Sequence, residues 1–137
     1  MEEDFVTYEI AVKLKEKGFK DLCLAYYTNT NDLYFNYSHK AGAKYSDCYL
    51  SHNLMPKDSV SGKFVDAPTI SQVLKWLRKK KLHIELWTVG KKPIKWCHTI
   101  TTLNHVGEKQ GWSSGTREDS YEAAAIAGIH YVIDNLI

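Results

Sequence analysis

The chain lacks long apolar runs and the short motifs that identify many enzymes. No apolar stretch approaches the roughly 18 residues of a transmembrane helix, so no membrane span is expected. The phosphate loop, the dinucleotide fingerprint, HExxH and GxSxG are all missing. These absences argue against the common nucleotide-binding, zinc-protease and hydrolase sites. We therefore do not expect an enzyme, and an enzyme acting on a small substrate is only the third hypothesis.

Charge of one sign is not in large excess either. The formal net charge is +2, so any attraction to nucleic acid must come from an uneven distribution of charge. The first residues, MEEDFVTYEI, are acidic where a signal peptide would be basic and then apolar. We expect a cytoplasmic protein.

Cysteine is scarce and shows no metal-binding spacing. Cys23, Cys48 and Cys97 are odd in number, form no close pair and have apolar or aromatic neighbours. Small, buried, reduced thiols are the usual outcome for such residues. No CxxC or HxxxH pair supports zinc, so we predict neither a metal nor a cofactor.

The residues that are present suit one α+β domain spanning 1–137. The chain is 44% hydrophobic and 25% charged, which is typical of a soluble globular domain. Apolar spacing predicts a helix over 7–17 that ends at Gly18, with Phe19 folding back on Leu14. Strands are expected at 22–28 and 32–38, joined by a hairpin turn, and a shorter strand around Cys48, followed by an irregular stretch over 51–67.

The second half of the chain has clearer signals. The stretch 66–81 is expected to hold a helix, with Thr69 as its cap and Gln72 completing a capping box. Asp119 with Glu122 is expected to form a second capping box, for a last helix over 120–136. Gly128 lies on the apolar stripe of that helix, which predicts a close approach to a sheet or another helix. Between the helices, alternation predicts strands at 82–89 and 94–103, with a brief edge strand near Trp112.

This order, α-β-β-β-α-β-β-(β)-α, predicts an antiparallel sheet with helices packed on one face. KLKEKGFKDLCLAYY and KWLRKKKLHIELW resemble each other, so a degenerate repeat of 5–50 and 69–115, followed by the C-terminal helix, is an alternative description.

Aromatic residues on a helix-free sheet face are the leading candidates for binding. Tyrosine and tryptophan are enriched in contact surfaces. His83 and His98 are expected on facing strands, where they would form a polar cluster with Glu85 on the outer face. A solvated sheet surface explains the histidines equally well. The predicted binding residues are Tyr34, Tyr37, Trp87, Trp96, His83 and His98, with Tyr26 or Tyr27 and the loop 51–67 beside them.

A basic segment over 75–95 carries the alternative hypothesis, nucleic-acid binding. It holds eight positive charges, opposed only by Glu85. Cations at the end of a helix also interact favourably with the helix dipole, by about 0.3–1 kcal/mol each, and this explains the run without a ligand. The basic patch consists of Lys75, Arg78, Lys79, Lys80, Lys81, Lys91 and Lys92, and Lys95 follows it.

The segment 69–136 resembles a double-stranded-RNA-binding domain in its element order. In that family the start of the last helix carries lysines that span the phosphates across the groove. Here that position reads REDSYEAAA and is acidic. The resemblance therefore covers the order of elements and not the chemistry of binding, and we do not place the chain in that family.

A second resemblance covers most of the chain. KLKEKGF, APTISQVLKWLR followed by LHIE, and SYEAAAIAGIHYVIDNLI resemble small proteins of gut anaerobic bacteria and their mobile elements, a group with no known activity. The resemblance implies a bacterial source, and it brings no known cofactor or catalytic residue. The sequence thus predicts a binding protein without catalysis, with a protein as the expected partner.

Overall fold

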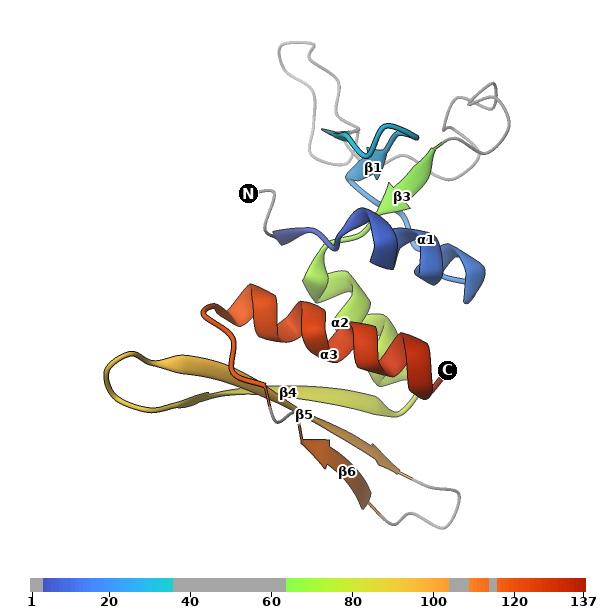
Figure 1. Cartoon of the computed structure of the whole chain (residues 1–137). Helices are drawn as coiled ribbons and strands as arrows, with labels where there is room; N and C mark the ends of the chain where they lie inside the picture. The colour runs from blue at the N-terminus through green and yellow to red at the C-terminus, as the bar shows by residue number, and fades with distance from the viewer. Residues whose placement is uncertain (1–3, 36–63, 104–108, 114–115) are drawn as a thin grey trace, which may run out of the picture. The chain divides into compact units, whose positions relative to one another are not determined.

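The computed structural model describes residues 4–35, 64–103, 109–113 and 116–137, which divide into two compact units, 1–69 and 70–137 (Figure 1). The α+β class and the predicted order of elements are confirmed. The strands form two three-stranded antiparallel sheets, one in each unit, where a single sheet was expected. The elements are α1 (Tyr8–Glu16), β1 (Ala25–Tyr27), β2 (Leu33–Phe35), β3 (Val65–Ala67), α2 (Ile70–Lys79), β4 (Leu82–Val89), β5 (Lys95–Leu103), β6 (Lys109–Ser113) and α3 (Tyr121–Asn135).

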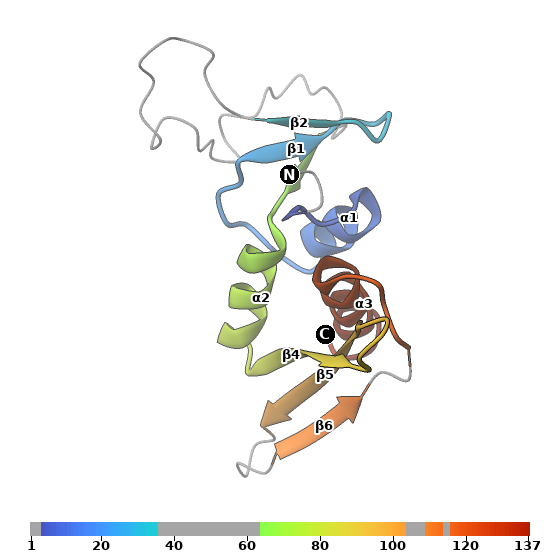
Figure 2. The same ribbon diagram turned by 90° about the vertical axis from the view of Figure 1, so that its left-hand side faces the viewer.

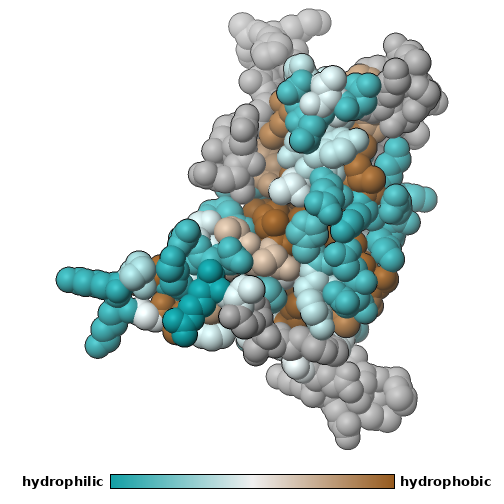
Figure 3. All heavy atoms as spheres, in the orientation of Figure 1, coloured by the Kyte–Doolittle hydropathy of each residue, from teal (hydrophilic) through white to brown (hydrophobic). Residues whose placement is uncertain are grey.

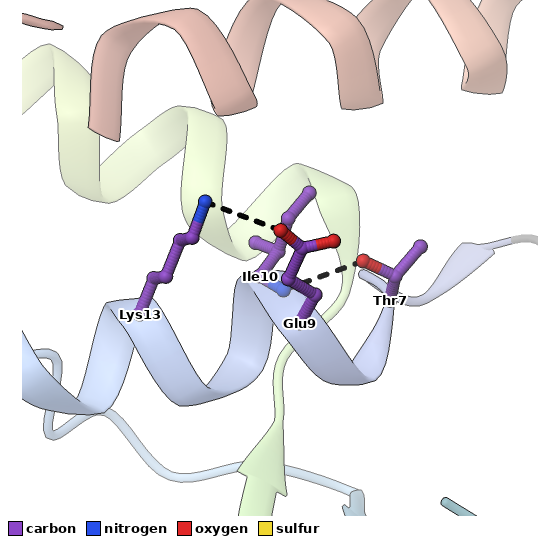
Figure 4. A network of polar contacts seen from close by, with 4 residues as sticks. All are labelled: Thr7, Glu9, Ile10 and Lys13. Carbon is purple, nitrogen blue, oxygen red and sulfur yellow. Dashed lines mark hydrogen bonds and ion pairs between the residues drawn. The ribbon is translucent and has the colours of Figure 1, made fainter. Parts of the chain in front are cut away.

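Helix α1 begins and ends as its sequence predicts. The Thr7 hydroxyl accepts a hydrogen bond from the Ile10 amide at 3.3 Å, which caps the first turn. Figure 4 shows this cap beside the ion pair between Lys13 and Glu9, which lie one turn apart with 3.3 Å between Nζ and Oε1.

The end of α1 is a Schellman motif. Gly18 has a φ of 89°, a backbone conformation that costs glycine little. Its amide bonds to the Lys15 carbonyl, and the amide of Phe19 bonds to the Leu14 carbonyl. Phe19 and Leu14 are both buried, as the predicted apolar contact requires.

The sheet of the first unit has the order β2-β1-β3. The hairpin of β1 and β2 is confirmed, and Asn31 in its turn has a φ of 66°. The third strand differs from the prediction. β3 lies at the end of the stretch that was expected to be irregular. Its side chains alternate as in a strand: Val65 and Ala67 are buried, and Asp66 is half-buried. The predicted strand around Cys48 lies outside the described residues.

Helix α1 packs on one face of this sheet. The Tyr27 ring meets the Tyr8 ring edge-on at 5.7 Å, and the Tyr27 hydroxyl donates to the Val6 carbonyl at 2.6 Å. Tyr26 has the opposite orientation, since successive side chains of a strand alternate between faces.

The second unit is a sheet of order β4-β5-β6, with α2 and α3 on one face (Figures 1 and 2). The predicted alternation in β4 is confirmed: Leu82, Ile84 and Leu86 are more buried than His83, Glu85 and Trp87. The brief edge strand expected near Trp112 is also confirmed, and it is β6. Helix α2 is anchored by its buried stripe of Ile70, Val73, Leu74 and Leu77.

Helix α3 is capped by Ser120, and the expected capping box of Asp119 and Glu122 is wrong. The Ser120 hydroxyl accepts from the Ala123 amide at 3.1 Å, because the helix begins one residue later than a cap at Asp119 requires. Asp119 forms an ion pair with Lys95 instead.

Among the described residues, Cys23 and Cys97 are buried and reduced, as predicted, and Cys48 is outside the described part. No helix in the described part of the chain is both long and apolar enough to cross a bilayer.

Candidate functional site

The outer face of the sheet in the second unit is the first candidate surface. It carries His83, Glu85 and Trp87 from β4, which pair with Thr101, Thr99 and the buried Cys97 of β5 in that order. Helices α2 and α3 lie on the other face, and no described element of this unit covers the outer one (Figure 2). The predicted placement of His83 and Trp87 on a helix-free face is therefore confirmed.

The Trp87 ring is exposed and yet held in place. Its side chain is 42% exposed. The indole Nε1 donates a hydrogen bond to Thr99 Oγ1 at 2.9 Å, across the two strands. An exposed ring with a fixed orientation offers apolar area to a partner while losing little conformational entropy on contact.

Trp96 and His98 do not join this surface, so the expected cluster of His83 with His98 is wrong. His98 pairs with Leu86, whose side chain faces the helices, and His83 pairs with Thr101. Partners directly opposite each other in an antiparallel pair share a face, which places His98 on the helix side.

Trp96 also belongs to the packing on the helix side. Its ring meets the Tyr121 ring of α3 edge-on at 5.3 Å. Its backbone exchanges two hydrogen bonds with Glu118, both 2.8 Å long. Trp96 thus fixes the chain that enters α3, and its half-buried ring is committed to that contact.

His98 is buried beneath α3, with only 6% of its surface exposed. Burial lowers the pKa of its imidazole below the ordinary value, and the nearby carboxylate of Glu118 opposes that change. The neutral form is therefore favoured.

A second candidate surface is the aromatic face of the sheet in the first unit. Tyr26 stacks on Tyr34, with ring centroids 5.8 Å apart, and meets the Phe64 ring at 5.3 Å. Tyr34 is 49% exposed. Of the two tyrosines left open by the sequence, Tyr26 lies on this face, and Tyr27 belongs to the core. Tyr37 and the predicted contact loop up to residue 63 lie outside the described residues.

The basic segment is divided into two patches. One lies at the end of α2 and the turn after it, and the other lies in the β4–β5 turn. The length of β4 separates them by roughly 25 Å at about 3.3 Å per residue. Figure 3 shows hydrophilic side chains at the projecting tip on the left, where Figure 1 draws the β4–β5 hairpin. All seven predicted residues are exposed, and none forms an ion pair with a described residue: Lys75, Arg78, Lys79, Lys80, Lys81, Lys91 and Lys92.

Two contacts occupy residues in or near this segment. The Lys80 ammonium lies 4.6 Å from the centroid of the Trp76 ring, one turn back along α2. Lys95 pairs with Asp119, and that contact lowers the pKa of the Asp119 carboxyl.

Sequence reasoning missed the open edge of β4. This eight-residue strand pairs with β5 along one edge, and no described strand pairs along the other. The signal was present in the sequence as LHIELWTV, a long alternating run without proline, but alternation alone does not say which strand lies at an edge.

The described residues offer little to catalysis. Cys97 pairs with Trp87 and His98 with Leu86, so this adjacent pair points to opposite faces, as predicted. Burial, together with Asp66 and Asp21, raises the pKa of the Cys23 thiol, which disfavours a nucleophilic thiolate. In the described part of the chain, no three His, Cys, Asp or Glu side chains are grouped so as to hold a metal ion.

Comparisons with protein-family models, with curated proteins and with solved structures found no match for this chain.

Proposed function

We propose that this chain is a cytoplasmic binding protein that contacts a partner protein through the outer face of the sheet β4-β5-β6 and carries out no reaction itself. The observation that supports this most is the Trp87 ring, which is 42% exposed and oriented by its bond to Thr99. Tryptophan is among the residues that contribute most to protein–protein contacts.

The neighbours of Trp87 suit a protein partner better than a small ligand. On the same face, Glu85 lies two residues from Trp87 along β4, and His83 and its partner Thr101 lie two residues further on. Their side chains can donate and accept hydrogen bonds. Small ligands bind mostly in concave, apolar sites, whereas protein interfaces combine an aromatic centre with a polar rim.

Site-specific photo-crosslinking tests this proposal. A photoreactive phenylalanine analogue replaces Trp87 in the full chain, expressed in its native cells, and the same analogue replaces Tyr131 in a control. Tyr131 is an exposed aromatic residue on α3, away from the outer face. We expect a discrete crosslinked protein from position 87 that is missing from position 131. Identical or absent products at both positions would contradict the proposal.

Nucleic-acid binding is a second candidate, supported by two observations. The second unit has the α-β-β-β-α order of a double-stranded-RNA-binding domain, and the basic residues of its two patches are exposed. The acidic residues Glu118, Asp119 and Glu122 at the start of α3 oppose it. A titration with oligonucleotides, described in the Discussion, distinguishes the two candidates.

A further inference from the structure

The geometry points to a more specific partner: an extended, acidic segment of another protein that adds as a strand to the open edge of β4. This inference rests on the proposed function and names the chemistry of the partner. The inference uses two features that a contact through the outer face does not use: the unpaired edge of β4 and the basic end of α2.

The edge itself is the first observation. A strand at the edge of a sheet presents a row of backbone N–H and C=O groups that can pair with another chain. Proteins usually protect such edges with short strands, charged side chains, proline, bulges or a covering element. The only charged side chain of β4 is Glu85. β4 has eight residues and contains no proline, and its register with β5 is unbroken from Leu82 to Val89. No described strand covers the other edge.

The side chains of β4 indicate the pattern of an added strand. On the helix side, Ile84 and Leu86 are only half-buried, so apolar surface remains at the edge. On the outer side, an added strand would lie beside His83 and Trp87. A partner segment with alternate apolar residues would place these against Ile84 and Leu86, and its polar residues would face the solvent side.

Charge indicates that the partner segment is acidic. The chain enters β4 through Lys79, Lys80 and Lys81, which are exposed and form no ion pair within the described residues. Glu85 is the single acidic residue of β4. Because these lysines lie just before β4, they favour acidic residues at the end of the added segment that lies beside Leu82. Glu85 disfavours a like charge directly opposite itself. A second copy of this chain would bring the same basic residues to the edge, so the charge favours a different, acidic protein.

A peptide-binding experiment tests the inference. The probe is a fluorescent peptide of about nine residues that alternates glutamate and valine, a length matched to β4. One control peptide has the same sequence with alternate backbone nitrogens methylated, which removes pairing and keeps the charge. A second control alternates lysine and valine. Binding is measured by fluorescence anisotropy, and hydrogen exchange of the β4 amides is followed by NMR.

The variants separate the edge from charge in general. The triple change Lys79→Gln, Lys80→Gln, Lys81→Gln removes the charge at the start of β4. The double change Lys91→Gln, Lys92→Gln removes charge at its other end. Thermal melts check that both variants fold. We expect the acidic peptide to bind and slow exchange in β4, and binding to weaken at least about tenfold with the methylated peptide and in the triple variant, corresponding to the loss of about 1.4 kcal/mol.

The outcomes are distinct. Equal binding of the methylated peptide, or an equal loss in the two variants, would show charge attraction without strand addition and overturn the inference. No binding of the acidic peptide at 1 mM would also overturn it, as would tighter binding of a duplex oligonucleotide that displaces the peptide. The crosslinking at position 87 is read separately, so the proposed function can stand when this inference fails.

Discussion

Gly128 of α3 lies so close to Ile84 of β4 that a Cβ atom added to the glycine would be 2.9 Å from Ile84 Cγ2 and 3.3 Å from His98 Cγ. Side chains rarely tolerate such distances, so the glycine allows α3 to approach the sheet, as its place on the apolar stripe predicts. Glycine costs about 1 kcal/mol against alanine in a helix. The close packing offsets that cost.

Replacing Gly128 with leucine should therefore overpack this contact. We expect the free energy of unfolding to fall by about 1–3 kcal/mol, measured by chemical denaturation. Gly128→Ala, which adds only the Cβ atom, should cost less when Ile84 is also changed to alanine, because that change removes the atom nearest to the new methyl group. An effect of Gly128→Ala that is the same in both backgrounds would mean that Ile84 does not limit the approach.

The buried imidazole of His98 should make stability depend on pH. Its pKa lies below the ordinary 6.5 in the folded protein, so its contribution is complete above pH 6.5. Below that pH the unfolded chain takes up the proton first, and stability is lost as the pH falls towards the folded pKa. Denaturation curves between about pH 7.5 and 5 should show this loss.

His98→Gln is the matched control for the pH dependence, since glutamine does not titrate. Its slope of stability against pH should be smaller over the same range, whatever its absolute stability. Glu118 is the charged group that opposes the shift, so Glu118→Gln should steepen the dependence. A slope in His98→Gln equal to that of the unchanged protein would assign the dependence to other groups.

The cap of α3 provides a third prediction. Ser120→Ala removes the acceptor of the Ala123 amide and should lower the free energy of unfolding by about 0.5–2 kcal/mol. Asp119→Ala should have a smaller effect, because the Asp119 carboxylate is exposed and pairs with Lys95 instead of capping the helix. Thermal melts of the two variants compare them directly, and a larger effect at Asp119 would restore the capping box that the sequence suggested.

The basic run at the end of α2 is not expected to be a nucleic-acid site. Lys80 already lies over Trp76, and the apolar stripe of α2 is committed to the core. We expect only weak binding of fluorescent single- and double-stranded oligonucleotides, equal in the unchanged protein and in a variant with alanine at 79, 80 and 81.

Specific binding of nucleic acid through the basic run would give a different result. Binding through about five phosphate contacts would give a log–log salt slope near −4 to −5 on duplex DNA. Micromolar binding with that slope, lost in the triple variant, would replace the protein-binding proposal with the nucleic-acid one.

Local signals made much of the fold predictable. Gly18 and Phe19 determine how α1 ends, and alternation in β4 determines which side chains face the helices. Pairing over a distance was not predictable in the same way. β3 is three residues long, too short for alternation to stand out, and its place beside β1 depends on partners far away in the sequence.

The candidate site was predictable only in part, for the same reason. The sequence indicates that Trp87 points away from Leu86, but whether His98 lies on the same side as His83 depends on the register between β4 and β5. The hairpin turn sets that register, and a shift of one residue would exchange the faces. The pairing of strands likewise determines which strand lies at an open edge, and composition does not reveal that pairing.

The pairing of β1 with β3 affects the order in which the chain folds. Tyr27 pairs with Val65, so this contact closes a loop over residues 28–64, whereas the β4–β5 hairpin closes over residues 90–94. The entropy of closing the longer loop is less favourable by roughly 2 kcal/mol. We expect the β4–β5 hairpin to form early and β3 to dock late. The first unit would then spend the longest part of folding with the edge of β1 exposed, which makes it the part of a newly made chain most vulnerable to misassembly.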